Sequence, residues 1–397
     1  MKFRDSAVNN RILMLDSYFD SLYGAQKSML VLAKGISFAA DPIIFSLRAG
    51  RLVDAAKDLG LATCIIGSGG ERAPVTYGKL ISSGSYFSAL TSYISDVRRA
   101  YALTRVMRIQ KLYANDIIAA LILIPISLLR SIDLYWYVRG NYTSQSRLAT
   151  LMHIIGVIFS KRIFLISNGV KSAFPSWVLS RYREKIVVLY IGIRAEEYFA
   201  RDKARCRAVV RAAYGIDALD RLVVCVGSIN PRKGQDLLVD AIDVIQREGL
   251  QSNYKVIIAG SPEGEYSMEY CVKLRRRADD AKLPIIFIDY GADIPVLLAA
   301  ADIFVLPSRE EAFGRATLEA MAAMLPCVIT RAGGNEELVS HEVSGLVVPQ
   351  ESERIAEALS LLLNNPEIRR SYGSAGLQIA LNRFSVDRYA EGFLRNL

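Results

Sequence analysis

The sequence offers few side chains of the kinds that bind metal ions. Its 397 residues include two histidines, His153 and His341, and neither has a second ligand-type residue at the spacing of a metal site. The motif Asp-x-Asp is absent from the whole chain. A site in which two such carboxylates hold a divalent cation is therefore unsupported, and we expect no metal cofactor.

The five cysteines have no paired spacing, which argues against a disulfide framework. Three of them lie in apolar runs that look like strands. We therefore expect buried, free thiols at all five positions. They are Cys64, Cys206, Cys225, Cys271 and Cys327.

The chain also lacks an apolar run long enough to cross a membrane. The longest run, Ile117 to Leu129, contains Pro125 and falls short of the roughly 20 residues that a spanning helix needs. Residues 1–10 are polar and include Asp5, so they do not resemble a signal peptide. We expect a cytoplasmic protein, and its hydrophobic content of 52% is compatible with a peripheral contact at the inner membrane face.

The length and the charge narrow the class of protein. A chain of 397 residues is too long for one typical domain, so two domains are expected. The formal net charge is +9 at pH 7. Such a charge favours an anionic membrane surface, an anionic ligand or a nucleic acid. Beyond that charge nothing indicates nucleic acid, because no groove-like pattern of basic and aromatic residues occurs.

Short apolar runs alternate with helix-like segments in both halves, which is the pattern of a doubly wound α/β sheet. The charged segment 194–203 breaks this alternation, and we expect one domain at 1–195 and a second at 196–383. The expected strands are 11–15, 43–47, 62–66, 117–124, 134–138, 163–166, 187–193, 223–226, 256–260, 285–288, 303–306 and 327–330.

A helix-like stretch from Asp96 to Tyr113 carries basic residues beside apolar ones. A basic amphipathic helix of this kind binds anionic membranes. The same pattern also fits an ordinary covering helix whose charged side faces water. Both interpretations remain open from the sequence.

The stretch from Ile303 to Ala323 predicts a strand, a polar loop and a helix in that order. Ile303 to Leu306 is a short buried run, and Arg315 to Ala323 contains good helix formers. This order places the amino end of a helix beside the carboxyl end of a parallel strand, where backbone N–H groups and the helix dipole attract an anion. A diphosphate fits this position.

Charged side chains flank that position. Glu311 lies in the loop, and Glu319 lies up to roughly 12 Å further along if every intervening residue is helical, so both can face one elongated ligand. Because carboxylates repel a diphosphate, their expected partners are hydroxyl groups, such as those of sugar rings. Lys233 also follows a strand end by a short loop, which places an ammonium group at the same edge.

Two motifs resemble those of the family 4 retaining glycosyltransferases. The string PSREEAFGRATLEAMA resembles the family signature, and Glu311 and Glu319 match its glutamate pair. The string GSINPRKG resembles the family's G-R-x-x-P-x-K-G element, in which basic residues hold the donor diphosphate. Lys233 matches that element. Ser228 stands where the family usually has an arginine, and Arg232 is the candidate to replace the missing charge.

By this resemblance the chain has the α/β GT-B fold, in which two Rossmann-like, doubly wound domains face each other across a cleft. The first domain would bind the acceptor and the second a nucleotide sugar, and a C-terminal helix of about 384–397 would pack back on the first. The implied reaction transfers a sugar, with retention of configuration and without a metal, to a glycan or a lipid-linked acceptor. Synthesis of cell-surface polysaccharide or glycolipid is the expected setting.

The resemblance also implies roles for single residues. Glu311 would hold the donor sugar and Glu319 the ribose, while Lys233 and nearby backbone N–H groups would stabilise the diphosphate charge. Gly24 would let the backbone approach the diphosphate. The amino-terminal loops lack a histidine that many members have, and Arg139, after the expected strand 134–138, is a candidate to take part of its place. The expected catalytic residues are Glu311, Lys233 and Arg139, and the expected donor-binding residues are Gly24, Ser228, Arg232, Lys233, Gly260, Tyr290, Glu311, Phe313, Gly314, Arg315, Ala316 and Glu319.

Two other functions remain open. In the first, the basic first domain binds a membrane or a glycan, and the nucleotide site is inactive. The exchange at Ser228 favours this function, whereas the intact Glu311, Glu319 and Lys233 argue against it. The second is a sugar-nucleotide epimerase, which shares the two-domain architecture, but the first half supplies few of the acids and histidines that such an enzyme needs.

Overall fold

The structure is a computed structural model that describes residues 10–18, 20, 22–67, 86–140, 147–249, 253–289 and 293–397. The chain forms two compact units. Unit 1 comprises Met1–Gly192 and Val386–Leu397, and unit 2 comprises Ile193–Ser385. Each unit is built around its own parallel sheet, as expected for the GT-B fold class.

Unit 1 has a seven-stranded sheet in the order β3-β2-β1-β4-β5-β6-β7, and its neighbouring strands are parallel. The direction of strand addition reverses between β1 and β4. Ligands of open α/β sheets bind outside the carboxyl ends of the strands at such a reversal. The strands are β1 Arg11–Asp16, β2 Asp41–Ser46, β3 Ala62–Ile65, β4 Lys111–Ala114, β5 Asp133–Val138, β6 Arg162–Leu165 and β7 Ile186–Val188.

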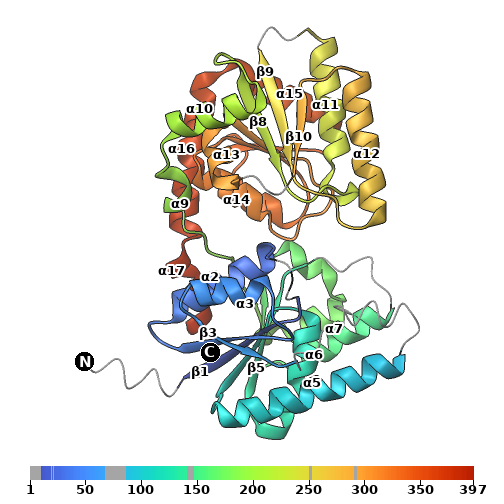
Figure 1. Ribbon diagram of the computed structural model, residues 1–397, viewed down its shortest axis with the longest axis vertical. Coiled ribbons are helices and arrows are strands. Elements are labelled where there is room, and N and C mark those ends of the chain that lie inside the picture. The colour runs from blue at the N-terminus through green and yellow to red at the C-terminus, as the bar shows by residue number, and fades with distance from the viewer. Residues whose placement is uncertain are drawn as a thin grey trace. The chain divides into compact units, whose positions relative to one another are not determined.

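Helices cover both faces of the unit 1 sheet, with α2 and α3 on one face and α5 and α6 on the other (Figure 1). This two-sided cover explains why the central strands are apolar except at their ends. The helices are α2 Gly24–Ile36, α3 Arg51–Asp58, α5 Tyr86–Val106, α6 Ile117–Arg130, α7 Arg147–Phe159 and α8 Ser176–Arg181, with 3₁₀ turns η1 Gly169–Ala173 and η2 Arg183–Lys185.

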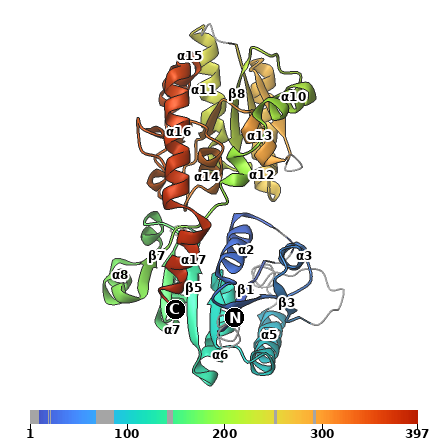
Figure 2. The same ribbon diagram turned by 90° about the vertical axis from the view of Figure 1, so that its left-hand side faces the viewer.

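The last helix of the chain, α17 (Val386–Leu394), belongs to unit 1 and packs against α2 (Figure 2). Its Phe393 lies among Tyr113, Tyr135 and Phe164, with ring centroids 5.3 to 6.4 Å apart. Tyr135 Oη also donates a hydrogen bond to the carbonyl of Leu397 at 2.5 Å. Aromatic contacts and this hydrogen bond therefore attach the end of the chain to β4, β5 and β6.

The segment 117–124 is part of helix α6, so the strand predicted there is wrong. A continuous apolar run fits a buried helix as well as a buried strand, and α6 is buried because it packs on β4 and β5 and contacts α5 and α7. Asp116 caps the amino end of α6 by accepting a hydrogen bond from the N–H of Ala119 at 2.9 Å. This cap is the sequence signal that distinguishes the two structures.

The helix predicted from Asp96 to Tyr113 ends earlier, at Val106. Arg108 has a φ of 53°, a left-handed conformation that an α-helix does not continue through. The residues that follow, Lys111–Ala114, form β4. The prediction joined a helix and a strand because both carry alternating basic and apolar residues.

Unit 2 has a six-stranded parallel sheet in the order β10-β9-β8-β11-β12-β13. The reversal lies between β8 and β11, which pair through Val223 with Ile303 and Val224 with Phe304. The sequence analysis did not predict β13. The strands are β8 Arg221–Val226, β9 Tyr254–Ala259, β10 Ile285–Ile288, β11 Ile303–Leu306, β12 Cys327–Thr330 and β13 Gly345–Val348.

In unit 2, α11, α12 and α15 share one hydrophobic core with the sheet, and α13 and α14 lie on the opposite face (Figure 1). The helix α16 packs on α14. The helices are α9 Glu196–Phe199, α10 Lys203–Tyr214, α11 Gln235–Arg247, α12 Glu265–Asp280, α13 Ile294–Ala300, α14 Arg315–Ala322, α15 Ser352–Asn364 and α16 Pro366–Arg383, with 3₁₀ turns η3 Pro231–Lys233 and η4 Gly334–Glu337.

The structure also tests the expectations about the cysteines and about membrane-spanning helices. The cysteines are free thiols, as predicted, and all are buried except Cys64, which is partly exposed. Within the described ranges, no helix has both the length and the apolar character needed to cross a membrane.

Two glycines in α16 give a test of how this helix packs on α14. A Cβ atom added to Gly373 would lie 2.2 Å from the carbonyl oxygen of Met324, whereas one added to Gly376 would lie 3.6 Å from its nearest neighbour. We expect Gly373→Ala to destabilise unit 2 by about 1–3 kcal/mol, because the backbone must move. The matched change Gly376→Ala should be neutral or stabilising by up to about 1 kcal/mol, because alanine favours a helix. Thermal unfolding followed by circular dichroism compares them, and equal Tm values would contradict the predicted close approach.

Candidate functional site

Lys233 and Glu311 meet at the carboxyl edge of the unit 2 sheet. Lys233 ends η3, after β8, and Glu311 lies in the loop after β11. The Nζ atom of Lys233 is 2.5 Å from Oε2 of Glu311, and the two side chains are 19% and 12% exposed. Ser308 Oγ donates a weaker hydrogen bond to the same carboxylate oxygen at 3.4 Å. Because β8 and β11 are neighbours at the strand-order reversal, their loops bring these two predicted residues together.

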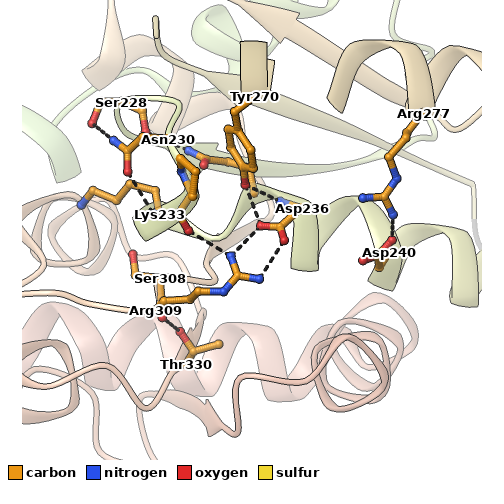
Figure 3. Close-up of polar contacts among 12 residues, drawn as sticks. Ser228, Asn230, Lys233, Asp236, Asp240, Tyr270, Arg277, Ser308, Arg309 and Thr330 are labelled. Carbon is orange, nitrogen blue, oxygen red and sulfur yellow. Dashed lines mark hydrogen bonds and ion pairs between the residues drawn. The ribbon is translucent and has the colours of Figure 1, made fainter. Parts of the chain in front are cut away.

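The loop that carries Lys233 is held by short-range hydrogen bonds. Asn230 caps η3, since its Oδ1 accepts from the N–H of Lys233 at 3.2 Å and its Nδ2 donates to Ser228 Oγ at 3.0 Å (Figure 3). Gly234 has a φ of 66°, and a Cβ there would lie 2.0 Å from the carbonyl oxygen of Pro307. Glycine is therefore required where the loops after β8 and β11 touch.

The amino end of α14 lies directly after the loop of Glu311. Gly314 is its N-cap residue, with a φ of 94°, and a Cβ there would lie 2.1 Å from Oδ1 of Asn335. Within the described ranges no side chain caps this helix, so the backbone N–H groups of Arg315 and Ala316 are suited to an anion. The Asn335 side chain is fully buried, and neither of its polar atoms has a hydrogen-bond partner in the described part of the chain.

Glu319 is a buried carboxylate on the second turn of α14. Its Oε1 accepts a hydrogen bond from Arg315 Nε at 2.8 Å. Tyr198 of α9 lies beside it, and burial followed by the negative charge of Glu319 raises the pKa of Tyr198 above its ordinary value. The carboxylate is thus oriented by its neighbours, as an acceptor for ligand hydroxyl groups should be.

The other predicted donor-binding residues of unit 2 lie in different environments. Phe313 is 2% exposed and packs edge-on against Phe384 with centroids 5.9 Å apart, so its side chain anchors the loop from the interior. Gly260, after β9, lies so close to the loop after β8 that a Cβ would be 1.9 Å from a carbonyl oxygen. Arg232 is exposed on η3. Tyr290 lies outside the described residues.

In unit 1, Asp16 is hydrogen-bonded to the first turn of α2, which begins at Gly24. The Asp16 carboxylate, at the end of β1, accepts hydrogen bonds from the N–H of Tyr18 at 2.8 Å and from Gln26 Nε2 at 3.1 Å. Asn115 Nδ2, after β4, donates to the same carboxylate at 2.5 Å. Because Gln26 lies in the first turn of α2, which begins at Gly24, these bonds fix the start of that helix.

Arg139, after β5, is held by several side chains of unit 1. Its Nε donates to Asn115 Oδ1 at 2.7 Å, and its Nη2 donates to Tyr113 Oη at 2.9 Å and to Tyr389 Oη at 3.2 Å. Nη1 donates to Ser28 Oγ. These bonds join β4, β5, α2 and α17. The observed role of Arg139 is therefore structural, and its catalytic role stays a prediction.

Asp116 is a second acid near Asp16, and it is partly buried. Its carboxylate accepts hydrogen bonds from the N–H and the Oγ of Ser17 at 2.8 and 2.9 Å. Burial, followed by the charge of Asp16, raises the pKa of Asp116 to about 7. Burial also raises the pKa of Asp16, although Arg139 partly compensates its charge.

Four residues of the unit 2 site were not predicted from the sequence. They are Asp236, Arg309, Tyr198 and Asn335. An acid such as Asp236 in the first turn of a helix is favourable, which is a weak sequence signal, but nothing near it in the sequence indicated its ion-pair partner Arg309. Tyr198 and Asn335 reach the site from α9 and η4, which are distant along the chain. An isolated sequence has no signal for such long-range neighbours.

Comparison with known proteins finds relatives for a large part of unit 2. Residues 207–378 match the family described as "Glycosyl transferases group 1". A D-inositol 3-phosphate glycosyltransferase of Saccharomonospora viridis is 34% identical over 197 residues, which are 47% of this chain and 45% of that protein. A GDP-mannose-dependent alpha-(1-6)-phosphatidylinositol monomannoside mannosyltransferase of Mycobacterium tuberculosis is 34% identical over 180 residues, 42% of this chain and 45% of that protein. The chain spans about half the length of these relatives.

Solved structures extend the similarity of fold to both units. The crystal structure of HepE from Anabaena in complex with UDP and glucose has a TM-score of 0.79 and 22% sequence identity, and covers 97% of this chain and 98% of that one. At this identity the likeness concerns the fold, which is GT-B-like in both proteins.

The raised pKa of Asp116 predicts how the stability of unit 1 depends on pH. A carboxyl group with a raised folded-state pKa stabilises the fold below its ordinary pKa, and this contribution is lost as pH rises through about 7. The stability of unit 1 should therefore decrease between pH 5 and pH 8. Asp116→Asn keeps an N-cap acceptor without the charge, so it should reduce this decrease by on the order of 1–3 kcal/mol.

Urea unfolding followed by tryptophan fluorescence measures this effect, because the two tryptophans, Trp136 and Trp177, both lie in unit 1. Asp54→Asn, on the exposed side of α3, is the matched control and should leave the pH dependence unchanged. Equal pH dependence in the Asp116 variant and the control would contradict the raised pKa.

Proposed function

Because residues 207–378 match the Glycosyl transferases group 1 family, we propose that the chain transfers a sugar from a nucleotide diphosphate sugar to an acceptor. The transfer retains the anomeric configuration, and it uses protein groups rather than a metal ion to stabilise the diphosphate. The observation that carries the proposal is the pairing of Lys233 with Glu311 beside the amino end of α14.

In the proposed complex, the diphosphate lies between Lys233 and the first N–H groups of α14. When the bond between the sugar and the diphosphate breaks, negative charge grows on the leaving phosphate oxygen. An ammonium group and a helix amino end stabilise such a charge most where they are already oriented before the reaction. The hydrogen bond from Asn230 and the close contact at Gly234 support this orientation of Lys233.

The two carboxylates would hold the hydroxyl groups on either side of the diphosphate. Glu311 is the closer to Lys233 and takes the donor sugar, while Glu319, held by Arg315, takes the ribose. A charged carboxylate is a strong acceptor for hydroxyl donors, and a pair of hydroxyls satisfies both of its oxygens. Lys233 exchanges its partner Glu311 for the diphosphate when the donor binds.

For the acceptor, we propose a glycan or a lipid-linked saccharide at the inner face of the membrane. Two observations support this: the net charge of +9 favours an anionic surface, and the mycobacterial relative is described as acting on a phosphatidylinositol mannoside. Unit 1 takes the acceptor in this proposal. A cytoplasmic, peripheral enzyme would reach such an acceptor without spanning the bilayer.

A panel of UDP, GDP and ADP sugars tests the proposal through thermal stabilisation and slow donor hydrolysis. One donor class should stabilise the wild type, by about 2.7 kcal/mol at a hundred times its dissociation constant. Glu311→Gln and Lys233→Ala should weaken that stabilisation and lower donor hydrolysis by roughly 10²–10³-fold, because each removes a charge that contacts the donor.

Glu310→Gln is the matched control, because Glu310 is the exposed neighbour of Glu311 and loses the same charge. It should bind and hydrolyse the donor as the wild type does. The proposal would be wrong if no sugar nucleotide stabilised the wild type, or if the variants at Glu310 and Glu311 behaved alike.

A further inference from the structure

We infer that Arg309 and Asp236, supported by Tyr270, form a clamp that sets the relative positions of Lys233 and Glu311. None of the three clamp residues is a predicted ligand of the donor, so they are positioning residues. The role of the clamp in donor binding rests on the proposed function, whereas the existence of the clamp is inferred from contacts within unit 2 alone.

Arg309 joins the loop after β11 to the loop after β8. Its backbone N–H donates to the carbonyl of Arg232 at 2.8 Å, and its Nη1 donates to the carbonyl of Pro231 at 2.9 Å. Both acceptors lie in η3, directly before Lys233, and Arg309 lies two residues before Glu311. Arg309 therefore connects the two backbones that carry the ion pair through its main chain and its side chain, next to a longer hydrogen bond from the N–H of Glu310 to the carbonyl of Arg232 at 3.3 Å.

Asp236 holds the guanidinium of Arg309 from the first turn of α11. Nη1 and Nη2 of Arg309 are each 2.7 Å from one oxygen of Asp236, so the two planar groups form parallel hydrogen bonds (Figure 3). The hydrogen bonds fix the direction of the guanidinium as well as its distance. A lysine at position 309 would keep the charge but lose this geometry.

Tyr270 of α12 supports Asp236 from the opposite side. Its hydroxyl donates to Asp236 Oδ1 at 2.6 Å and accepts a hydrogen bond from the N–H of Asp236 at 2.9 Å. Burial acts to raise the pKa of Asp236, but the hydrogen bonds from Arg309 and Tyr270 outweigh it and hold that pKa below the ordinary value. The carboxylate therefore stays charged, and the clamp stays closed, at neutral pH.

The loop of Glu311 is also fixed on its other side. Thr330 Oγ1, at the end of β12, donates to the carbonyl of Ser308 at 2.5 Å, and the N–H of Glu311 donates to the carbonyl of Ala332 at 2.9 Å. Besides the ion pair of Glu311 with Lys233, the side chain of Arg309 also reaches the loop after β8. Weakening the contacts of Arg309 should let the distance between Lys233 and Glu311 vary more, while the sheet stays intact.

A second ion pair, between α12 and α11, is an ordinary surface pair with which the clamp can be compared. Arg277 of α12 pairs with Asp240 of α11, about one turn beyond Asp236, and the two side chains are 49% and 37% exposed (Figure 3). This pair connects the two helices and has no contact with either loop in the described structure. Arg277→Lys is therefore the matched control for Arg309→Lys.

The test measures loop protection and nucleotide binding in Arg309→Lys, Asp236→Asn, the double variant and Arg277→Lys. Hydrogen–deuterium exchange should become faster in residues 228–236 and 307–314 of the clamp variants, while β8 and β11 keep their protection. If UDP or GDP binds the wild type, each single clamp variant should raise its dissociation constant about tenfold. The double variant should lose no more than either single one, because both act through one interaction.

Different results separate the clamp from the proposed function. Unchanged exchange in both loops of Arg309→Lys, or effects of the two single changes that add fully, would overturn the clamp. A wild type that binds neither nucleotide would count against the proposed function, and the exchange measurement would still decide the clamp. Tyr270→Phe, which removes one hydroxyl group, repeats the test with the smallest change if the other variants fold poorly.

Discussion

The site in unit 2 depends on one constraint, the pairing of β8 with β11 at the point where the strand order reverses. The connections that follow these two strands leave toward opposite faces of the sheet, so space remains between them at the carboxyl edge. Lys233 and Glu311 occupy that space although 78 positions separate them in the chain. Asn230, Asp236, Arg309 and Thr330 then hold these two loops in place.

Unit 1 has the same constraint at β1 and β4 and uses it differently. Asp16 ends β1 and Asn115 follows β4, but their side chains are buried: Asn115 donates to Asp16 and accepts a hydrogen bond from Arg139. Charged groups removed from water are costly to desolvate, and burial, followed by the charge of Asp16, raises the pKa of the nearby Asp116 to about 7. The network therefore acts on the fold, by fixing the start of α2 and the position of α17.

Local patterns and long-range contacts differ in how well they could be predicted from the sequence. The strands 285–288, 303–306 and 327–330 were predicted with their observed bounds, because short apolar runs between polar loops have a clear pattern. The pairing of Lys233 with Glu311 was also accessible, since parallel strands place their following loops at one edge. In contrast, the apolar run at 117–124 was assigned to a strand, because its helical cap at Asp116 was overlooked. The contacts of Arg139 with Ser28, Tyr113 and Tyr389 come from three distant segments, and no local pattern encodes them.

The ion pair of Lys233 with Glu311 affects which ligands the site would select under the proposed function. Lys233 and Glu311 are both mostly buried, so neither charge is well hydrated, and each depends on the other. A ligand with phosphate groups alone would satisfy Lys233 but leave Glu311 without its partner. A ligand with both a diphosphate and a sugar satisfies both side chains, so the pair itself favours the complete donor over the free nucleotide. The clamp serves the same selectivity. A partly exposed ion pair such as Arg309 with Asp236 contributes only about 0–1 kcal/mol to stability. Its effect is to hold Lys233 and Glu311 in position while Lys233 exchanges Glu311 for the diphosphate.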